Sequence, residues 1–160
     1  MGSEAKFPVP GTVLWAVDVE LEREVFRSGA SGKPNVDYLR WIDIGVDDKE
    51  GRIPEEELEI GLKPGQGISL FLERMIPEGM VVMDAASWKK LDKYKRKEVH
   101  WWGIDQGHPL PSGLSLVYDG KPPGHCTLTI TRPMAIKSFL SLVALIPFSK
   151  KGKEFYGATH

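Results

Sequence analysis

The sequence contains one cysteine, no excess of basic residues and no apolar run long enough for a membrane span. A single cysteine excludes an internal disulfide and indicates a reducing, intracellular setting. The formal net charge of −1 argues against nucleic acid as a partner, because proteins that bind it usually carry a basic excess. The most apolar run, residues 139–148, has about half the length of a membrane-spanning helix, so we expect no membrane partner. Residues 1–10 lack the apolar core of a secretory signal.

Motifs for metals and dinucleotides are missing as well. The four histidines have no repeated spacing, and the carboxylates of residues 43–59 are not spaced as in a calcium loop. We therefore expect no metal site and interpret residues 43–59 as a solvated face. Gly65 and Gly67 precede a strand pattern rather than a helix, which excludes the dinucleotide fingerprint. Cys126 lies among alternating apolar residues and is interpreted as a core residue rather than a nucleophile.

The remaining composition is typical of one globular domain. Hydrophobic residues make up 41% of the sequence and charged residues 27%, which are the proportions of an ordinary soluble protein. The 17 glycines and 12 prolines favour short strands and many turns over a helical bundle. We divide the chain into a flexible lead (residues 1–10), one domain (residues 11–149) and a polar, frayed tail (residues 150–160).

Residues 124–134 show the clearest local pattern. Apolar residues alternate with threonines from position 126 to position 131, which is the period of a half-buried strand. His125 stands at the start of this strand. Pro133 suits the first turn of a following helix, which the apolar residues 134–148 are expected to form against the sheet. The segment alone also allows a plainer interpretation, in which the threonines are strand formers and the histidine is an edge residue.

A hairpin is predicted around this strand. Residues 114–118 form a strand pattern, and the turn residues 119–124 lead back into residues 125–130. The hairpin would bring Asp119 and His125 to the same end of the sheet. Upstream, a glycine turn opens a strand over residues 68–72, in which Ser69 faces away from the core side.

Two more strands are predicted, one over residues 11–19 and a buried one over residues 80–83. A helix start follows, capped by Asp84 or Ser87. Six basic residues then lie between Lys89 and Lys97, close to three tryptophans that could stack bases. Nearby acidic residues dilute this charge, and residues 43–59 could neutralise it across the surface. A nucleic-acid-binding module that uses Lys89–Lys97 is therefore kept as the weaker alternative.

Several motifs together resemble one known family. The segments that carry the resemblance are residues 14–17, 67–71, 110–119, 124–128 and 132–134. They contain a Leu-Trp-Ala-Val first strand, a Gly-Ile-Ser-Leu-Phe strand, a Leu-Pro-x-Gly turn, a His-x-Thr strand start and a Pro-Met pair. The chain thus resembles a family of bacterial type VI secretion cytotoxins with fungal relatives, whose fold is similar to that of ADP-ribosyltransferases. The similarity is most specific over residues 62–72 and 107–134.

The resemblance implies an α/β domain of the α+β type, with small, packed, mostly antiparallel sheets and flanking helices. It also implies a cleft that accepts NAD, toxicity to the cell that makes the protein, and action in the cytoplasm. The macromolecular target is not implied. A neutralising immunity-type protein, as a partner, would be expected to cover the mouth of the cleft around Ser69 and His125.

Transferred residue by residue, the resemblance gives catalytic roles to Ser69, His125 and Thr127. The serine would orient a catalytic group or the nicotinamide ribose by hydrogen bonding. The histidine would stabilise the oxocarbenium-like ribose as hydrogen-bond donor or as general acid or base. The residues on the cofactor side are Trp15, Gly67 and Asp119. Trp15 stands where the family has an arginine, which could hold phosphates. The implied activity is an NAD-dependent, ADP-ribosyltransferase-like transfer, and the alternative is a non-catalytic ligand- or protein-binding domain on the same fold.

Overall fold

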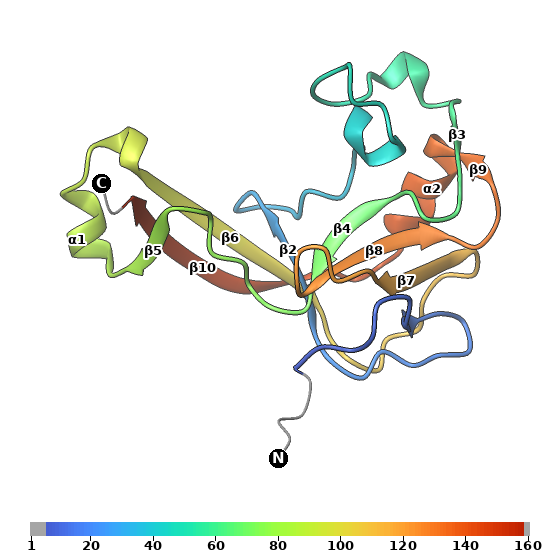
Figure 1. Ribbon diagram of the computed structural model, residues 1–160, viewed down its shortest axis with the longest axis horizontal. Coiled ribbons are helices and arrows are strands. Elements are labelled where there is room, and N and C mark those ends of the chain that lie inside the picture. The colour runs from blue at the N-terminus through green and yellow to red at the C-terminus, as the bar shows by residue number, and fades with distance from the viewer. Residues whose placement is uncertain (1–5, 159–160) are drawn as a thin grey trace.

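Ten β-strands form the framework of residues 6–158, the part of the chain that the computed structural model describes (Figure 1). Eight of them make one antiparallel sheet in the order β1-β7-β8-β4-β2-β6-β10-β5. These eight are β1 (Val13–Trp15), β2 (Val25–Gly29), β4 (Ile68–Phe71), β5 (Met80–Met83), β6 (Arg96–Ile104), β7 (Leu114–Tyr118), β8 (His125–Ile130) and β10 (Ser149–Ala158). The other two, β3 (Gly61–Leu62) and β9 (Met134–Ala135), form a separate ribbon.

Helices are few and short in the described residues. Two are α-helices, α1 (Ala85–Lys89) and α2 (Ile136–Val143), and three are 3-10 helices, η1 (Trp41–Ile44), η2 (Glu55–Glu57) and η3 (Lys93–Lys95). The chain is therefore a mixed α+β domain with a mostly antiparallel sheet, as predicted. The expected small packed sheets are instead one continuous eight-stranded sheet and a two-stranded ribbon.

The large sheet narrows between β2 and β4, which share a single register pair, Phe26 with Phe71. On one side of this join, β4, β8, β7 and β1 belong to the body of the molecule. On the other side, β6, β10 and β5 extend away from the body (Figure 1). We call residues 80–104 and 149–158 the arm. The main hydrophobic cluster lies in the body and includes Val25 and Ile104 next to the join, and the arm has a small cluster of its own, Val99, Trp101 and Tyr156.

The main core joins the body half of the sheet to α2. Ile68 and Leu70 of β4 and Cys126 and Leu128 of β8 are at most 1% exposed and belong to one cluster. The side chains that α2 adds to this cluster are Ile136, Phe139 and Val143. The alternation predicted for β8 is confirmed except at Thr129, which is buried as well. Cys126 is a core residue, as predicted.

The helix predicted over residues 134–148 begins later and is shorter. Pro133 does not lie in its first turn, because Met134 pairs with Leu62 in the β3–β9 ribbon. The N–H of Ile136 donates to the carbonyl of Ile60 at 2.9 Å. This bond ties the first helical residue to the residue just before β3, and the helix runs from there for eight residues.

The predicted polar tail is wrong, because residues 149–158 form a strand inside the sheet. β10 pairs with β6 on one side and with β5 on the other. Tyr156 is fully buried beside Val99 and Trp101. The polar composition hides this strand, since few of its side chains need burial. The domain thus extends at least to Ala158, and residues 159–160 lie outside the described residues.

The predicted flexible lead lies partly outside the described residues, which begin at position 6. Within the lead, Phe7 stacks on Tyr118, with 6.0 Å between ring centroids, and packs against the main core. This part of the lead is therefore anchored. The strand predicted over residues 11–19 is much shorter, because β1 spans Val13–Trp15 and the chain then turns at a bridge between Ala16 and Val19.

The strand predicted over residues 80–83 exists, but it is not buried. Val81 and Val82 of β5 are 45% and 54% exposed, because β5 is the last strand of the arm. The predicted cap of the next helix is confirmed. The Asp84 carboxylate accepts a hydrogen bond from the Ser87 N–H at 2.8 Å at the start of α1, and this bond lowers the pKa of the carboxyl group.

Gly67 determines how closely β4 approaches β8. A Cβ atom at this position would overlap the carbonyl oxygen of Leu128. We expect Gly67→Ala to lower the free energy of unfolding by about 2–3 kcal/mol, because a backbone atom cannot move aside. Gly61→Ala is the control, since nothing lies within 4 Å of its added methyl group, and should stay within about 0.5 kcal/mol. Urea unfolding of both variants measures the difference, and equal stabilities would contradict this account of the β4–β8 contact.

Candidate functional site

The candidate site lies on the face of β4 and β8 that is turned away from the main core. The two strands are antiparallel, with Ser69 opposite Thr127 and Phe71 opposite His125. Because paired residues share a face, the serine, the threonine and the histidine project to the same side. The core residues Ile68, Leu70, Cys126 and Leu128 occupy the other face. The predicted orientation of Ser69 is therefore confirmed.

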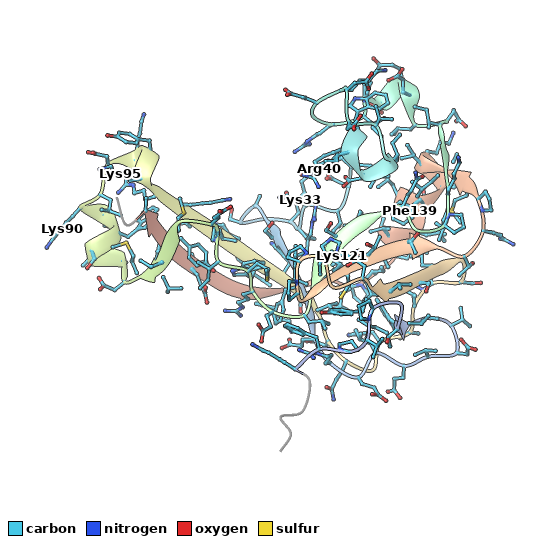
Figure 2. All side chains as sticks on the ribbon, in the orientation of Figure 1. Lys33, Arg40, Lys90, Lys95, Lys121 and Phe139 are labelled. Carbon is cyan, nitrogen blue, oxygen red and sulfur yellow. The ribbon has the colours of Figure 1, made fainter. Side chains whose placement is uncertain are left out.

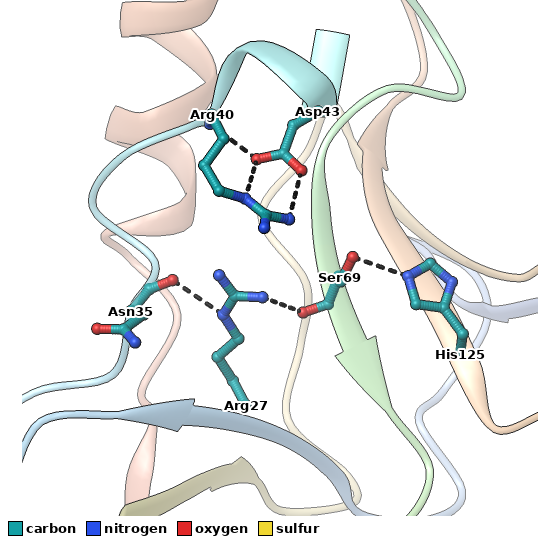
Figure 3. A network of polar contacts seen from close by, with 6 residues as sticks. All are labelled: Arg27, Asn35, Arg40, Asp43, Ser69 and His125. Atoms are coloured by element: carbon teal, nitrogen blue, oxygen red, sulfur yellow. Dashed lines mark hydrogen bonds and ion pairs between the residues drawn. The ribbon is translucent and has the colours of Figure 1, made fainter. Parts of the chain in front are cut away.

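A hydrogen-bonded chain connects Asp119, His125 and Ser69. His125 Nδ1 lies 2.5 Å from Asp119 Oδ1, and His125 Nε2 lies 2.7 Å from Ser69 Oγ. Figure 3 shows the serine–histidine contact across the two strands. The His125 side chain is only 14% exposed, whereas that of Asp119 is 42% exposed. We refer to these three residues as the relay.

The hairpin turn places the aspartate beside the histidine, as predicted. The N–H groups of Asp119 and Gly120 both donate to the carbonyl of His125, at 3.2 and 3.0 Å. Gly120 and Gly124 have φ angles of 68° and 91°, which residues other than glycine rarely adopt. Thr127 Oγ1 donates to Asp119 Oδ2 at 3.0 Å. The carboxylate is thus held by the histidine through one oxygen and by the threonine through the other.

The proton positions in the relay follow from its chemistry. An ionised carboxylate only accepts hydrogen bonds, so His125 Nδ1 carries the proton that faces Asp119. In the neutral imidazole, Nε2 then has a free lone pair and accepts a hydrogen bond from the Ser69 hydroxyl. This is the arrangement of a nucleophile, a base and a group that orients the base. It can remove a proton from Ser69, or from another hydroxyl group or a water molecule bound in its place.

Arg27 of β2 is the residue of this region that sequence reasoning missed. Its Nε donates to the carbonyl of Asn35 and its Nη1 to the carbonyl of Ser69, each at 2.9 Å (Figure 3). Within the described residues it has no ion-pair partner, while the nearby Arg40 pairs with Asp43 at 3.1 Å. Burial is the main cause that lowers the pKa of Arg27. The signal in the sequence is an arginine directly after Val-Phe, in a segment where alternating charges hide the strand.

Two residues expected on the cofactor side have no surface for a ligand. Trp15 is 0% exposed and its Nε1 donates to the carbonyl of His108 at 2.7 Å, so it is a core residue. Gly67 is buried against Leu128 of β8 and serves strand packing. The expectation that Trp15 and Gly67 contact a cofactor is therefore wrong. Only Asp119, of the three cofactor-side residues, has a side chain at the site.

A cavity of about 440 Å³ adjoins the relay on the side of Asp119. The residues that line it are Pro64, Gly65, Ser115, Val117, Asp119, Thr127, Thr129, Ile130 and Thr131. Ser69 and His125 lie next to this cavity but not in its wall. Thr129 holds the loop of residues 64–66 at the edge of the cavity. Its Oγ1 accepts a hydrogen bond from the Gly65 N–H at 2.8 Å and donates one to the Gln66 carbonyl at 2.6 Å. Other hollows, at residues 6–23 and 132–145, contain no relay residue.

Other chemistries find little support in the described part of the chain. Burial, with a smaller contribution from the Asp119 charge, raises the pKa of the Cys126 thiol to about 12, so it is not an available nucleophile. Residues 6–158 contain no group of three or more His, Cys, Asp and Glu side chains that could hold a metal ion. Neither described α-helix has the length and apolar character required to cross a bilayer. No protein-family model, curated protein or solved structure matches the chain.

The relay can be tested without knowledge of the substrate by Ser69→Cys. A thiol beside His125 should ionise at lower pH than an ordinary cysteine, whose pKa is about 8.5. We expect alkylation by iodoacetamide at about pH 6.5 to be at least roughly tenfold faster than in the exposed control Ser141→Cys. Adding Asp119→Asn should remove most of this difference. The wild-type protein should not react while folded, and equal pH profiles for both cysteine variants would contradict the relay.

Proposed function

We propose that the chain is a cytoplasmic toxin that resembles ADP-ribosyltransferases and uses the relay for NAD-dependent transfer. The observation that supports this proposal most is the contact of Ser69 with His125 at 2.7 Å. They are two of the three residues that the family resemblance marks as catalytic, and they come from segments 56 positions apart. Asp119 and Thr127 complete the same polar cluster.

Each residue of the cluster has a role in the proposed reaction. As the bond between nicotinamide and ribose C1 breaks, a hydroxyl group or a water molecule attacks C1 and loses its proton to His125 Nε2. Asp119 stabilises the imidazolium that forms. Ser69 orients the ribose by hydrogen bonding. Arg27 supplies positive charge beside β4, which suits an anionic pyrophosphate and takes over from the arginine that Trp15 replaces.

The toxin proposal predicts that induction of the wild-type gene slows growth, whereas induction of Ser69→Ala or His125→Ala does not. Asp119→Asn should reduce nicotinamide release roughly 100-fold or more, because the histidine loses its orienting partner. Ser141→Ala and His108→Ala, both outside the cluster, are the matched controls and should remain toxic. Growth curves at equal expression measure toxicity, a calorimetric NAD titration of the purified protein measures binding, and chromatography of the reaction mixture measures nicotinamide release.

Two results would contradict different parts of the proposal. If all variants slow growth equally, the relay is not the source of toxicity. If growth depends on the relay but NAD does not bind at millimolar concentration, NAD is not the substrate. Retained toxicity without any turnover would favour the non-catalytic binding domain.

The relay geometry favours a second candidate function, acyl transfer through a serine nucleophile. Ser69 Oγ would attack the carbonyl carbon of an ester, and its proton would pass to His125 Nε2. The imidazolium would then protonate the leaving alcohol, and water would release the acid by the reverse sequence. This chemistry needs no co-reactant other than water.

A fluorophosphonate probe separates the two candidates, because it reacts only with an activated serine. Under acyl transfer we expect Ser69 to be labelled, the signal to vanish in Ser69→Ala, and the labelling rate to fall at least roughly 100-fold in His125→Ala. Ser141→Ala should label like the wild type. Mass spectrometry of the labelled peptide identifies the residue. Nicotinamide release without any labelling would reject acyl transfer and leave NAD chemistry in place.

A further inference from the structure

The arm projects from the body as a three-stranded extension of the sheet (Figure 1). β6 and β10 form its length, β5 forms its outer edge, and α1 and η3 lie at its end. Lys90 and Lys95 mark this end, far from the body (Figure 2). Such an extension is accessible to a partner from several sides and contains none of the relay residues.

The arm has a net positive charge, whereas the rest of the chain has a net negative charge. Residues 80–104 and 149–158 contain nine basic and four acidic side chains, a net charge of +5. The rest of the chain contains twelve basic and eighteen acidic side chains, a net charge of −6. The five lysines from Lys89 to Lys97 take part in no ion pair within the described residues. Residues 43–59 lie at the opposite end of the molecule and do not neutralise them (Figure 1).

The outer edge of the arm is an unpaired strand. β5 is the last strand in the sheet order and pairs with β10 through the registers Met83–Phe155 to Met80–Ala158. No other strand pairs with it in residues 6–158. Its two central residues, Val81 and Val82, are about half exposed. An edge strand with free main-chain groups and exposed valines is a template for an added strand.

Aromatic packing keeps this edge in place. Trp88 of α1 contacts Phe155 of β10, with ring centroids 4.8 Å apart, and the Arg96 guanidinium lies 4.5 Å from the Trp88 ring. Trp101 and Tyr156 form the small core beneath. A preformed edge needs little ordering when a partner binds.

We propose that β5 binds an extended acidic segment of a partner protein, which adds to the sheet as a further strand. Main-chain hydrogen bonds would provide the pairing, and the arm lysines would select carboxylates. Nucleic acid fits less well, because two of the three tryptophans that could stack bases are already engaged. Trp101 is 3% exposed, and the Trp88 ring packs against Arg96 and Phe155.

A fluorescent peptide of about eight residues that alternates valine with glutamate tests this surface. Anisotropy should show binding to the wild-type protein that weakens at least roughly tenfold in Lys90→Glu/Lys93→Glu. The matched control Lys49→Glu/Lys63→Glu reverses two exposed lysines of the body and should bind like the wild type. The amide signals of β5 should shift on binding. A peptide of the same charge with prolines at alternate positions should not bind, since it cannot pair as a strand.

Four results would overturn the proposal. Equal binding of the proline peptide would exclude strand addition, and equal loss in the two double variants would exclude the arm. Tighter binding of an oligouridylate than of the peptide would identify a nucleic-acid surface instead. Self-association in sedimentation equilibrium that Lys90→Glu/Lys93→Glu abolishes would identify a second copy of the chain as the occupant.

Discussion

The antiparallel register between β4 and β8 is the constraint on which the rest of the site depends. Because side chains alternate along a strand, a slip of one residue would turn Ser69 into the core and Ile68 out of it. Gly67 sets the distance between these strands, since no side chain fits against Leu128. The same register that buries the apolar face therefore aligns Ser69 with Thr127 and brings it within reach of His125. Folding and site geometry cannot be separated here.

Near the paired strands β4 and β8, polar side chains find their hydrogen-bond partners in two different ways. The relay residues satisfy one another, so that the histidine has a partner on each nitrogen. Arg27 donates to two carbonyl oxygens and forms no ion pair within the described residues, although the Asp43 charge partly opposes the lowering of its pKa by burial. A half-buried cation without an ion-pair partner is unfavourable. The positive charge next to β4 is thus a feature that an anionic ligand would stabilise.

Local sequence patterns correctly predicted the features that depend on residues close to one another in the chain. The β7–β8 hairpin, the cap at Asp84 and the meeting of Asp119 with His125 all follow from turn residues and strand alternation. β10 and β6 could not be predicted in this way, because runs of charged residues occupy the first half of each strand and their pairing spans about 50 residues. For the same reason local patterns did not indicate that Arg27 lies beside Ser69, because this position requires β2 to pair with both β4 and β6. Long-range pairing, rather than local propensity, decides these elements.

The position of the cavity bears on which chemistry the relay serves. Its wall contains the Asp119 carboxylate and several hydroxyl groups, whereas Ser69 Oγ lies beside it. A ligand in this cavity would therefore meet acceptors and hydroxyls before it meets the serine. Sugar hydroxyls suit such a wall, because carboxylates accept their hydrogen bonds and threonines exchange them. The wall is thus compatible with the sugar hydroxyls of the proposed ribosyl substrate, with the relay residues beside it.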